Sequence, residues 1–315
     1  MNRPRVSSAL PRARAAGRAV TSGEPPPAPP EPAGAPARLG ARIHGLRIGL
    51  RSDHAALLRR LAERLPRGWR RAAGGRPQRL YTLVADGRGE RALYADGALL
   101  ARGRRLPATL DAFESDVQLH VAEWAPRRVF VHAGAVGWRG RAIIVPGRSL
   151  SGKSTLVREL VRAGATYYSD EYAVLDARGR LHPFARPLAL RTARGTRRRV
   201  RPESLAARIG VRPLPVGLVV VTRYRAGARW RPRHLSPSAG ALALLANTVS
   251  VRREPTAAMT AVQAVVLQAV ILQGVRGEAR EVARALLDLA GGANGTPPGA
   301  GRPRPPAARG PGARR

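Results

Sequence analysis

The chain has 315 residues and a formal net charge of +36, with 56 Lys and Arg residues against 20 Asp and Glu residues. It contains no cysteine, which excludes a disulfide scaffold, a thiolate metal site and a cysteine nucleophile. A charge this high favours anionic partners such as nucleotides, acidic peptides, nucleic acids or anionic membranes.

Both ends of the chain have the composition of segments that form no packed core. Residues 1–38 hold nine prolines and six arginines, and residues 291–315 are mostly Gly, Pro, Ala and Arg. These two segments carry charges of +4 and +5, so +27 lies between them. We therefore expect four parts: a disordered Pro/Arg-rich tail at 1–40, a small α+β part at 41–126, a larger P-loop domain with C-terminal helices at 127–290, and a disordered tail at 291–315.

The first folded part shows alternating helix and strand patterns without a chemical motif. Asp53 is a candidate helix cap, and two Asp-Gly pairs mark turns after strands. The predicted elements are a strand at 46–50, a helix at 54–64, a hairpin of strands at 78–84 and 91–94, and a helix at 108–124.

The second part alternates short apolar runs with helical patterns, which predicts an α/β fold. Ser236 before Pro237 is a helix start signal. We expect strands at 129–136, 142–146, 172–175 and 217–222, one more strand ending at the acid pair described below, and helices at 154–163, 237–248, 256–273 and 278–290.

No segment predicts membrane insertion or secretion. Arginines interrupt any apolar run near the N-terminus, so no signal peptide is predicted. Residues 255–275 carry no charge, but three glutamines interrupt them, which favours a buried core helix over a membrane span. We expect a cytoplasmic protein with no membrane partner.

A glycine-bounded loop follows the predicted strand at 142–146 and fits the pattern G-x-x-x-x-G-K-[ST] without a mismatch. Its glycines allow backbone N–H groups to surround phosphate oxygens at the start of a helix. Lys153, the only lysine of the chain, would reach the β- and γ-phosphates, and Ser154 would bind Mg²⁺. The predicted nucleotide-binding residues are Gly147, Arg148, Ser149, Leu150, Ser151, Gly152, Lys153, Ser154 and Thr155. The alternative is a chance match in a Gly/Ser-rich turn.

A phosphate-binding loop needs an acid beside it, and the strand at 217–222 ends in Thr-Arg without one. Asp170 and Glu171 lie at the end of the strand that follows the loop's helix, 16 and 17 residues beyond Ser154. In a right-handed crossover that end meets the loop at one sheet edge. One carboxylate would bind Mg²⁺ with Ser154, and the other would accept a proton. The alternative is a solvated turn.

His132 lies in the apolar strand at 129–136. If this strand pairs beside the loop's strand, His132 reaches the same edge of the sheet. The alternative is a hydrogen-bonded core histidine.

Three segments together resemble the catalytic domain of the HPr kinase/phosphorylase family: Val131–Gly134, Gly147–Thr155 and Gly164–Glu171. Residues 41–290 are similar to the shorter HPr-kinase-like bacterial proteins found beside peptide-modification genes, which share the Tyr-Tyr-Ser-Asp-Glu and His-Pro…Arg-Pro-Leu segments. The resemblance implies a fold related to phosphoenolpyruvate carboxykinase and possible homo-oligomers.

The resemblance also implies the reaction, which is transfer of a phosphoryl group from ATP to a protein serine. Asp170 would be the general base, His132 would support the site, and Glu171 stands where the family has a second aspartate. No counterpart of the family's C-terminal glycine-rich signature follows, so the resemblance extends neither to phosphorolysis nor to HPr as the acceptor.

We therefore expect an ATP- and Mg²⁺-dependent kinase acting on a serine-type hydroxyl of a protein or peptide. Arg186, Arg191 or Arg194 would stabilise transferring charge or, alternatively, belong to a solvated surface. Two other functions stay open: a nucleotide-binding accessory or sensor protein of a peptide-modification system, and a nucleic-acid-stimulated NTPase. Few aromatic residues interleave with the basic ones, so nucleic acid is not the favoured partner.

Overall fold

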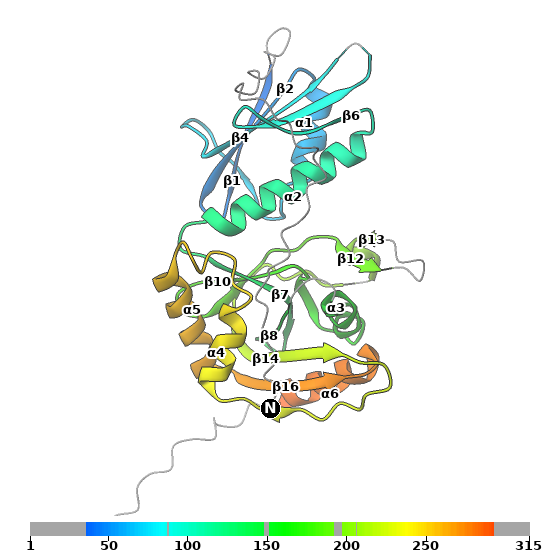
Figure 1. Cartoon of the computed structure of the whole chain (residues 1–315), viewed down its shortest axis with the longest axis vertical. Coiled ribbons are helices and arrows are strands. Elements are labelled where there is room, and N and C mark those ends of the chain that lie inside the picture. The colour runs from blue at the N-terminus through cyan, green and yellow to red at the C-terminus, as the bar shows by residue number, and fades with distance from the viewer. Residues whose placement is uncertain (1–35, 87, 148–150, 192–196, 206, 293–315) are drawn as a thin grey trace, which may run out of the picture.

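The computed structural model describes residues 36–86, 88–147, 151–191, 197–205 and 207–292. In these residues the protein is a mixed α/β structure with two mixed sheets, a separate two-stranded sheet and six α-helices. The N-terminal part, with the first sheet and helices α1 and α2, lies above the second, larger part in Figure 1. The expected α/β class is therefore confirmed.

The N-terminal sheet has the strand order β3-β1-β2-β4-β5-β6, and only the β2–β4 pair is parallel. Helices α1 and α2 pack on it and bury their apolar side chains in a core that also includes Phe130, Tyr172 and Phe184 of the second part. The two parts therefore share one hydrophobic cluster. The elements are β1 (Ala37–Ile43), β2 (Leu46–Ser52), α1 (Ala55–Ala62), β3 (Arg70–Arg71), β4 (Arg79–Ala85), β5 (Arg91–Ala95), β6 (Ala98–Gly103) and α2 (Leu106–Trp124).

Two details of this part differ from the sequence prediction. Strand β1 begins at Ala37, inside the range predicted as a tail, because its alternate residues Ala41 and Ile43 pack into the core. Asp53 does not cap α1, whose N-cap position is His54. Instead, the Ala85 N–H donates a hydrogen bond of 2.7 Å to Asp53 Oδ2, which joins the ends of β2 and β4.

The second sheet has the order β11-β10-β7-β8-β14-β16-β15, and β9 pairs with β7 beside β10. Its central strands β8, β14 and β16 are parallel, whereas β7 is antiparallel to β8. The strands are β7 (Val129–Trp138), β8 (Arg141–Pro146), β9 (Thr166–Ser169), β10 (Tyr172–Leu175), β11 (Arg180–His182), β14 (Leu214–Tyr224), β15 (Arg233–His234) and β16 (Val270–Arg276); β12 (Leu188–Arg191) and β13 (Arg197–Val200) form the separate pair.

Helices cover both faces of this sheet (Figure 1). Ile143 and Val145 of β8 pack with α3 (Lys153–Arg162) and α6 (Ala279–Gly292), while Ile144 packs with α4 (Pro237–Leu245) and α5 (Pro255–Gln268). The strand before the loop is therefore buried on both faces, as its continuous apolar run predicted. The predicted cap of α4 is also confirmed, because the Ala239 N–H donates to Ser236 Oγ at 3.3 Å.

The helix predicted at 256–273 is wrong beyond Gln268. Helix α5 ends there, and Val270–Arg276 forms β16, which pairs in parallel with β14. Val270 and Ile271 are β-branched, and burial of Ile271 and Leu272 in the sheet core decides the outcome over the helical spacing. In the described part of the chain, no helix is long and apolar enough to cross a membrane.

Candidate functional site

The predicted phosphate-binding loop connects β8 to α3 at the C-terminal edge of the parallel strands. The Gly147 N–H donates to the His132 carbonyl at 3.0 Å, which fixes the start of the loop against β7. Gly152 is the N-cap residue of α3 and has a left-handed backbone with φ +82°. Three predicted nucleotide-binding residues, Arg148, Ser149 and Leu150, lie outside the described residues, so their roles stay predictions.

Lys153 begins α3 and its side chain is buried. Helix α3 packs directly on β7, because a Cβ atom at Gly134 would come within 2.4 Å of Val157 Cγ2. Burial lowers the pKa of Lys153, whereas the charges of Glu171 and Asp170 act in the opposite direction and raise it. The fold therefore brings the lysine of the loop into the electrostatic reach of the predicted acid pair.

The acid pair interrupts what would otherwise be one long strand. Strands β9 and β10 both pair antiparallel with β7, and Asp170 and Glu171 form the break between them. Asp170 is only 3% exposed and accepts a hydrogen bond of 3.2 Å from the Tyr167 hydroxyl. A solvated turn is therefore excluded for Asp170, whereas Glu171 is partly exposed and its backbone N–H donates to Ser169 Oγ at 3.3 Å.

The direction of the strands explains why the acids reach the loop. Strands β8 and β9 pair with the two sides of β7, and both run antiparallel to it. Their C-terminal ends therefore lie at the same edge of the sheet. Strand β14, the direct neighbour of β8, contains no Asp or Glu, as the sequence predicted. The carboxylates thus reach the loop from β9, which pairs with β7 on the side opposite to β8.

His132 lies opposite Tyr172 in the β7–β10 pair, at the same edge. Its Nδ1 is 3.8 Å from Glu171 Oε1, and its ring centroid is 4.7 Å from that of Tyr172. Burial lowers the pKa of His132, and Lys153 lowers it further, while Glu171 opposes both. His132 is thus a partly exposed imidazole next to Glu171, and its supporting role stays a prediction.

Among the residues that the structure describes, no group of three or more His, Cys, Asp or Glu side chains can hold a metal ion by itself. Mg²⁺ at nucleotide sites takes one or two carboxylates together with phosphate and water oxygens. The predicted ligands Ser154, Asp170 and Glu171 would form a site of this kind, which needs phosphate oxygens in addition to the protein side chains. They would complete a magnesium site only together with a bound nucleotide.

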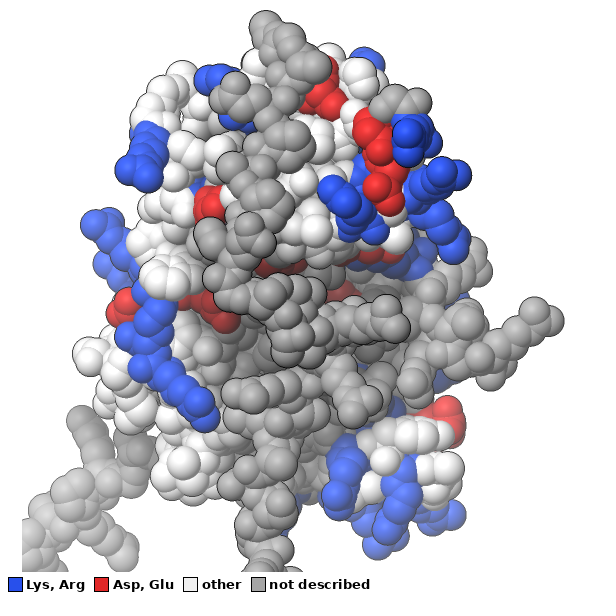
Figure 2. All heavy atoms as spheres, turned by 45° about the horizontal axis from the view of Figure 1, so that its top comes forward, with Lys and Arg blue, Asp and Glu red and all other residues white. Residues whose placement is uncertain are grey.

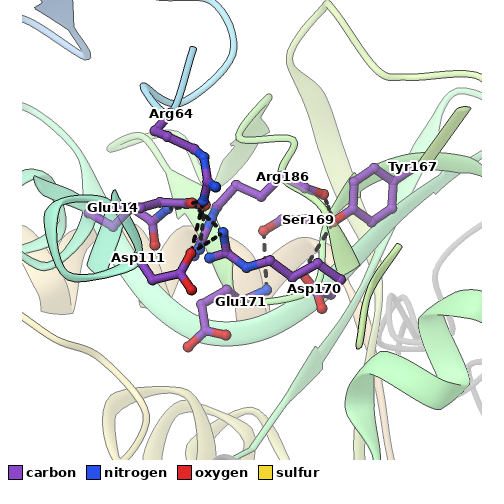
Figure 3. A network of polar contacts seen from close by, with 10 residues as sticks. Arg64, Asp111, Glu114, Tyr167, Ser169, Asp170, Glu171 and Arg186 are labelled. Carbon is purple, nitrogen blue, oxygen red and sulfur yellow. Dashed lines mark hydrogen bonds and ion pairs between the residues drawn. The ribbon is translucent and has the colours of Figure 1, made fainter. Parts of the chain in front are cut away.

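Tyr167 was not predicted as a site residue. Its hydroxyl contacts both Asp170 Oδ1 and the Arg186 carbonyl oxygen, the latter at 2.8 Å, and burial together with the charge of Asp170 raises its pKa well above the usual value. It therefore stays protonated and orients the carboxylate (Figure 3). Its position in β9, three residues before Asp170, could have indicated that it lies close to the acid pair.

One of the three arginines predicted to stabilise transferring charge, Arg186, makes an ion pair in the structure. The Arg186 guanidinium pairs with Glu114 of α2 at 3.2 Å and spans from that helix towards Tyr167 (Figure 3). Arg191 ends β12, and Arg194 lies outside the described residues. On the face shown in Figure 2, basic side chains form several separate groups interspersed with acidic ones.

Arg276 is a second residue that sequence reasoning missed. It ends β16 and donates from Nη2 at 2.9 Å to the carbonyl of Gly152, the residue before Lys153. Nothing in the sequence indicated that Arg276 lies near the loop, because the predicted helix at 256–273 replaced most of β16. It is the only described arginine with a hydrogen bond to Gly152.

A scan against protein-family models finds no match for this chain. A comparison with curated proteins also finds no match. The assignment of function therefore depends on the geometry of the site and on the resemblance of its motifs.

Proposed function

We propose that this chain is an ATP- and Mg²⁺-dependent kinase that transfers the γ-phosphate to a serine-type hydroxyl of a protein or peptide. One observation carries the proposal: Lys153 at the start of α3 and the acid pair Asp170–Glu171 meet at one edge of the sheet, although they come from opposite sides of β7. A chance glycine-rich turn would have no reason to face a buried carboxylate.

The residues around the loop fit a polyphosphate. A side chain at Gly147 would crowd Ser151, since its Cβ atom would lie 3.0 Å from Ser151 Oγ. Ser151 Oγ is itself buried and makes no hydrogen bond to any described residue. The positive end of α3 lies beside Ser151, where an anion is stabilised. A nucleotide phosphate would supply the missing hydrogen-bond partner of Ser151 Oγ.

Each residue then has a chemical task. Lys153 and the backbone N–H groups at the start of α3 hold the phosphates, and Ser154 and Glu171 would bind Mg²⁺, which neutralises charge that develops on the phosphoryl oxygens. Asp170 accepts the proton of the acceptor hydroxyl while the new O–P bond forms and the bond to the bridging oxygen breaks, which releases ADP. Tyr167 orients Asp170, and His132 flanks Glu171.

The proposed fold is that of HPr kinase and phosphoenolpyruvate carboxykinase. It is supported by the order of the motifs along the chain and by the shared edge of β7, β8 and β9. The net charge of +27 on the folded part suits an acidic or carboxylate-bearing acceptor.

Transfer of labelled γ-phosphate to peptides and proteins of a host lysate tests the proposal. We expect Lys153→Ala to weaken ATP binding, and Asp170→Asn to lower transfer about 10²- to 10⁴-fold while ATP binding is kept. Asp176→Asn is the matched control, because Asp176 lies beyond the other end of β10, where it bonds His182 at 2.8 Å. It should leave transfer unchanged.

Other outcomes identify the alternatives. Tight ATP binding without any transfer would indicate a sensor. Label released only as free phosphate, at a rate that rises with added RNA or DNA and falls steeply with salt, would indicate a nucleic-acid-stimulated NTPase. Either result would contradict the kinase proposal.

A further inference from the structure

Arg276 reaches the phosphate-binding edge from a strand that the motifs do not include. Strands β14 and β16 are parallel, and Arg276 is opposite Tyr224 at the last position of their pairing. Since β8 runs parallel to β14, all three strands end at the edge where the loop begins. The arginine therefore lies beside the N-terminus of α3, although 122 residues separate it from Ser154 in the sequence.

The guanidinium is held by backbone oxygens and an aromatic ring. Nη2 donates to the Gly152 carbonyl at 2.9 Å and Nη1 to the Gly277 carbonyl at 3.1 Å. The guanidinium carbon lies 5.3 Å from the centre of the Tyr224 ring. Nε is buried and has no hydrogen-bond partner within the described residues. These contacts fix the position of the charge but do not neutralise it.

No ion pair joins Arg276 to a carboxylate among the described residues, although the residue is only 2% exposed. Glu278, whose charge acts on Arg276, accepts a hydrogen bond of 3.2 Å from the Tyr224 hydroxyl instead. Burial lowers the pKa of Arg276, and Tyr224 and Glu278 only partly oppose this. A buried charge without an ion pair is costly, so its retention requires a compensating anion.

The geometry of Gly152 is adapted to this arginine. With φ at +82°, Gly152 adopts a conformation that other residues rarely take, and a Cβ atom there would lie 2.3 Å from Arg276 Nη2. The glycine thus leaves the space that the guanidinium occupies. Its carbonyl accepts bonds from Arg276 and from the Leu156 N–H, the latter at 3.1 Å, so the arginine fixes the first turn of α3.

We propose that Arg276 is a positioning residue for a nucleoside di- or triphosphate: it fixes Gly152 at the start of α3 and supplies positive charge that the ligand's pyrophosphate neutralises. This inference rests on the proposed nucleotide site, but it does not depend on phosphoryl transfer. It predicts that the arginine acts on every ligand with a pyrophosphate group and not on the bare nucleoside.

Binding measurements on the full chain test the inference without an activity assay. Calorimetric titration with Mg²⁺–ADP, Mg²⁺–pyrophosphate and adenosine should show that Arg276→Ala weakens binding of the first two about 30-fold, the effect of losing a charge-assisted hydrogen bond. Added guanidinium ion at millimolar concentration should restore part of that loss. Arg276→Lys, which keeps the charge, should lose less affinity than Arg276→Gln.

Arg253→Ala is the matched control. Arg253 also stacks on an aromatic ring, at 4.3 Å from the centre of Trp124, and donates from Nε to the Glu123 carbonyl at 2.9 Å, but these partners belong to the end of α2 and not to α3. Its loss should leave ADP binding unchanged. An equal effect of both substitutions would mean a general loss of folded structure and would overturn the inference.

The remaining outcomes are also decisive. If the unaltered chain binds neither ADP nor pyrophosphate, the proposed function and this inference both fail. If it binds them and Arg276→Ala binds them equally well, the inference fails and the proposed function stands. Should Arg276→Ala not fold, the Lys and Gln variants decide, because equal dissociation constants for these two would contradict a role of the charge.

Discussion

Two groups of buried charge in this protein are built in opposite ways. Between the N-terminal part and the second part, the guanidinium groups of Arg64, Arg186 and Arg199 surround a single buried carboxylate, Glu114, which is 3% exposed. At the phosphate-binding edge, Arg276 is equally buried but bonds only to backbone oxygens in the described structure. The arginines of the first group pair with a carboxylate of the protein itself, whereas Arg276 does not.

The difference shows how to read a chain that contains many arginines. Net charge does not separate structural arginines from functional ones, because most of the described basic residues lie on the surface or in ion pairs. What does separate structural arginines from functional ones is whether a buried guanidinium group has a carboxylate partner. The cluster around Glu114 holds two parts of the fold together, whereas Arg276 leaves a charge that a phosphate ligand would complete.

The largest expected effect is on stability and concerns the cluster of arginines around Glu114. Glu114→Gln would leave three guanidinium groups around a neutral amide in a buried place, so we expect the free energy of unfolding to fall by about 3–5 kcal/mol. Burial raises the pKa of Glu114, but its bonds to Arg199 and Arg64 outweigh burial, and the net pKa is lowered. The carboxylate is therefore charged at neutral pH, and urea unfolding monitored by circular dichroism would measure the loss.

Asp111→Asn provides the matched control for this experiment. Asp111 pairs with two of the same arginines, Arg64 and Arg199, but its side chain is 56% exposed. Exposed pairs contribute less than about 1 kcal/mol. If the two substitutions destabilise the protein equally, burial does not set the strength of the cluster and the comparison fails.

A second prediction concerns acid sensitivity at the junction of the two parts. His44 packs against the rings of Phe130 and Phe184, at 5.7 and 5.6 Å, and burial, with the charges of Arg128 and His182, lowers its pKa to about 4. The unfolded chain therefore binds more protons between pH 4 and 6.5. Stability is fully present above pH 6.5 and falls by on the order of 3 kcal/mol as the pH drops to 4.

His44→Asn should flatten this part of the stability curve. His44 has φ at +45°, a conformation that asparagine tolerates better than most residues. Urea unfolding at pH 4.5 and 7 should show a smaller difference for this variant than for the unaltered chain. The exposed His54 at the start of α1, changed to Asn, should keep the full difference; an unchanged slope in His44→Asn would refute the assignment.

The sequence predicted the loop, the acid pair and the buried strand before the loop, because each of these is local. Glycine spacing, a single lysine and an apolar run are visible within about 30 residues. Arg276 and the strand β16 were missed because their roles depend on pairing with β14, which is distant in the sequence. The sequence also predicted a strand on each side of the acid pair, but it gave no sign that both strands pair with β7, because that pairing is visible only in the structure.

The smallest expected effect concerns the link between the Glu114 cluster and Asp170. The Tyr167 hydroxyl has a single proton and contacts both Asp170 and the carbonyl of Arg186, whose guanidinium pairs with Glu114. Tyr167→Phe should lower phosphoryl transfer about five-fold, which corresponds to the loss of about 1 kcal/mol for one hydrogen bond, and should leave the dissociation constant for ADP unchanged.

Tyr168→Phe separates an effect on the site from a general loss of a buried bond. Tyr168 follows in the same strand, points to the opposite face and donates to the Arg212 carbonyl at 2.7 Å. Its loss should cost similar stability but no transfer rate. If both variants slow transfer equally, Tyr167 acts only through the stability of the fold. The general base Asp170 would then not depend on the cluster around Glu114 that joins the two parts of the fold.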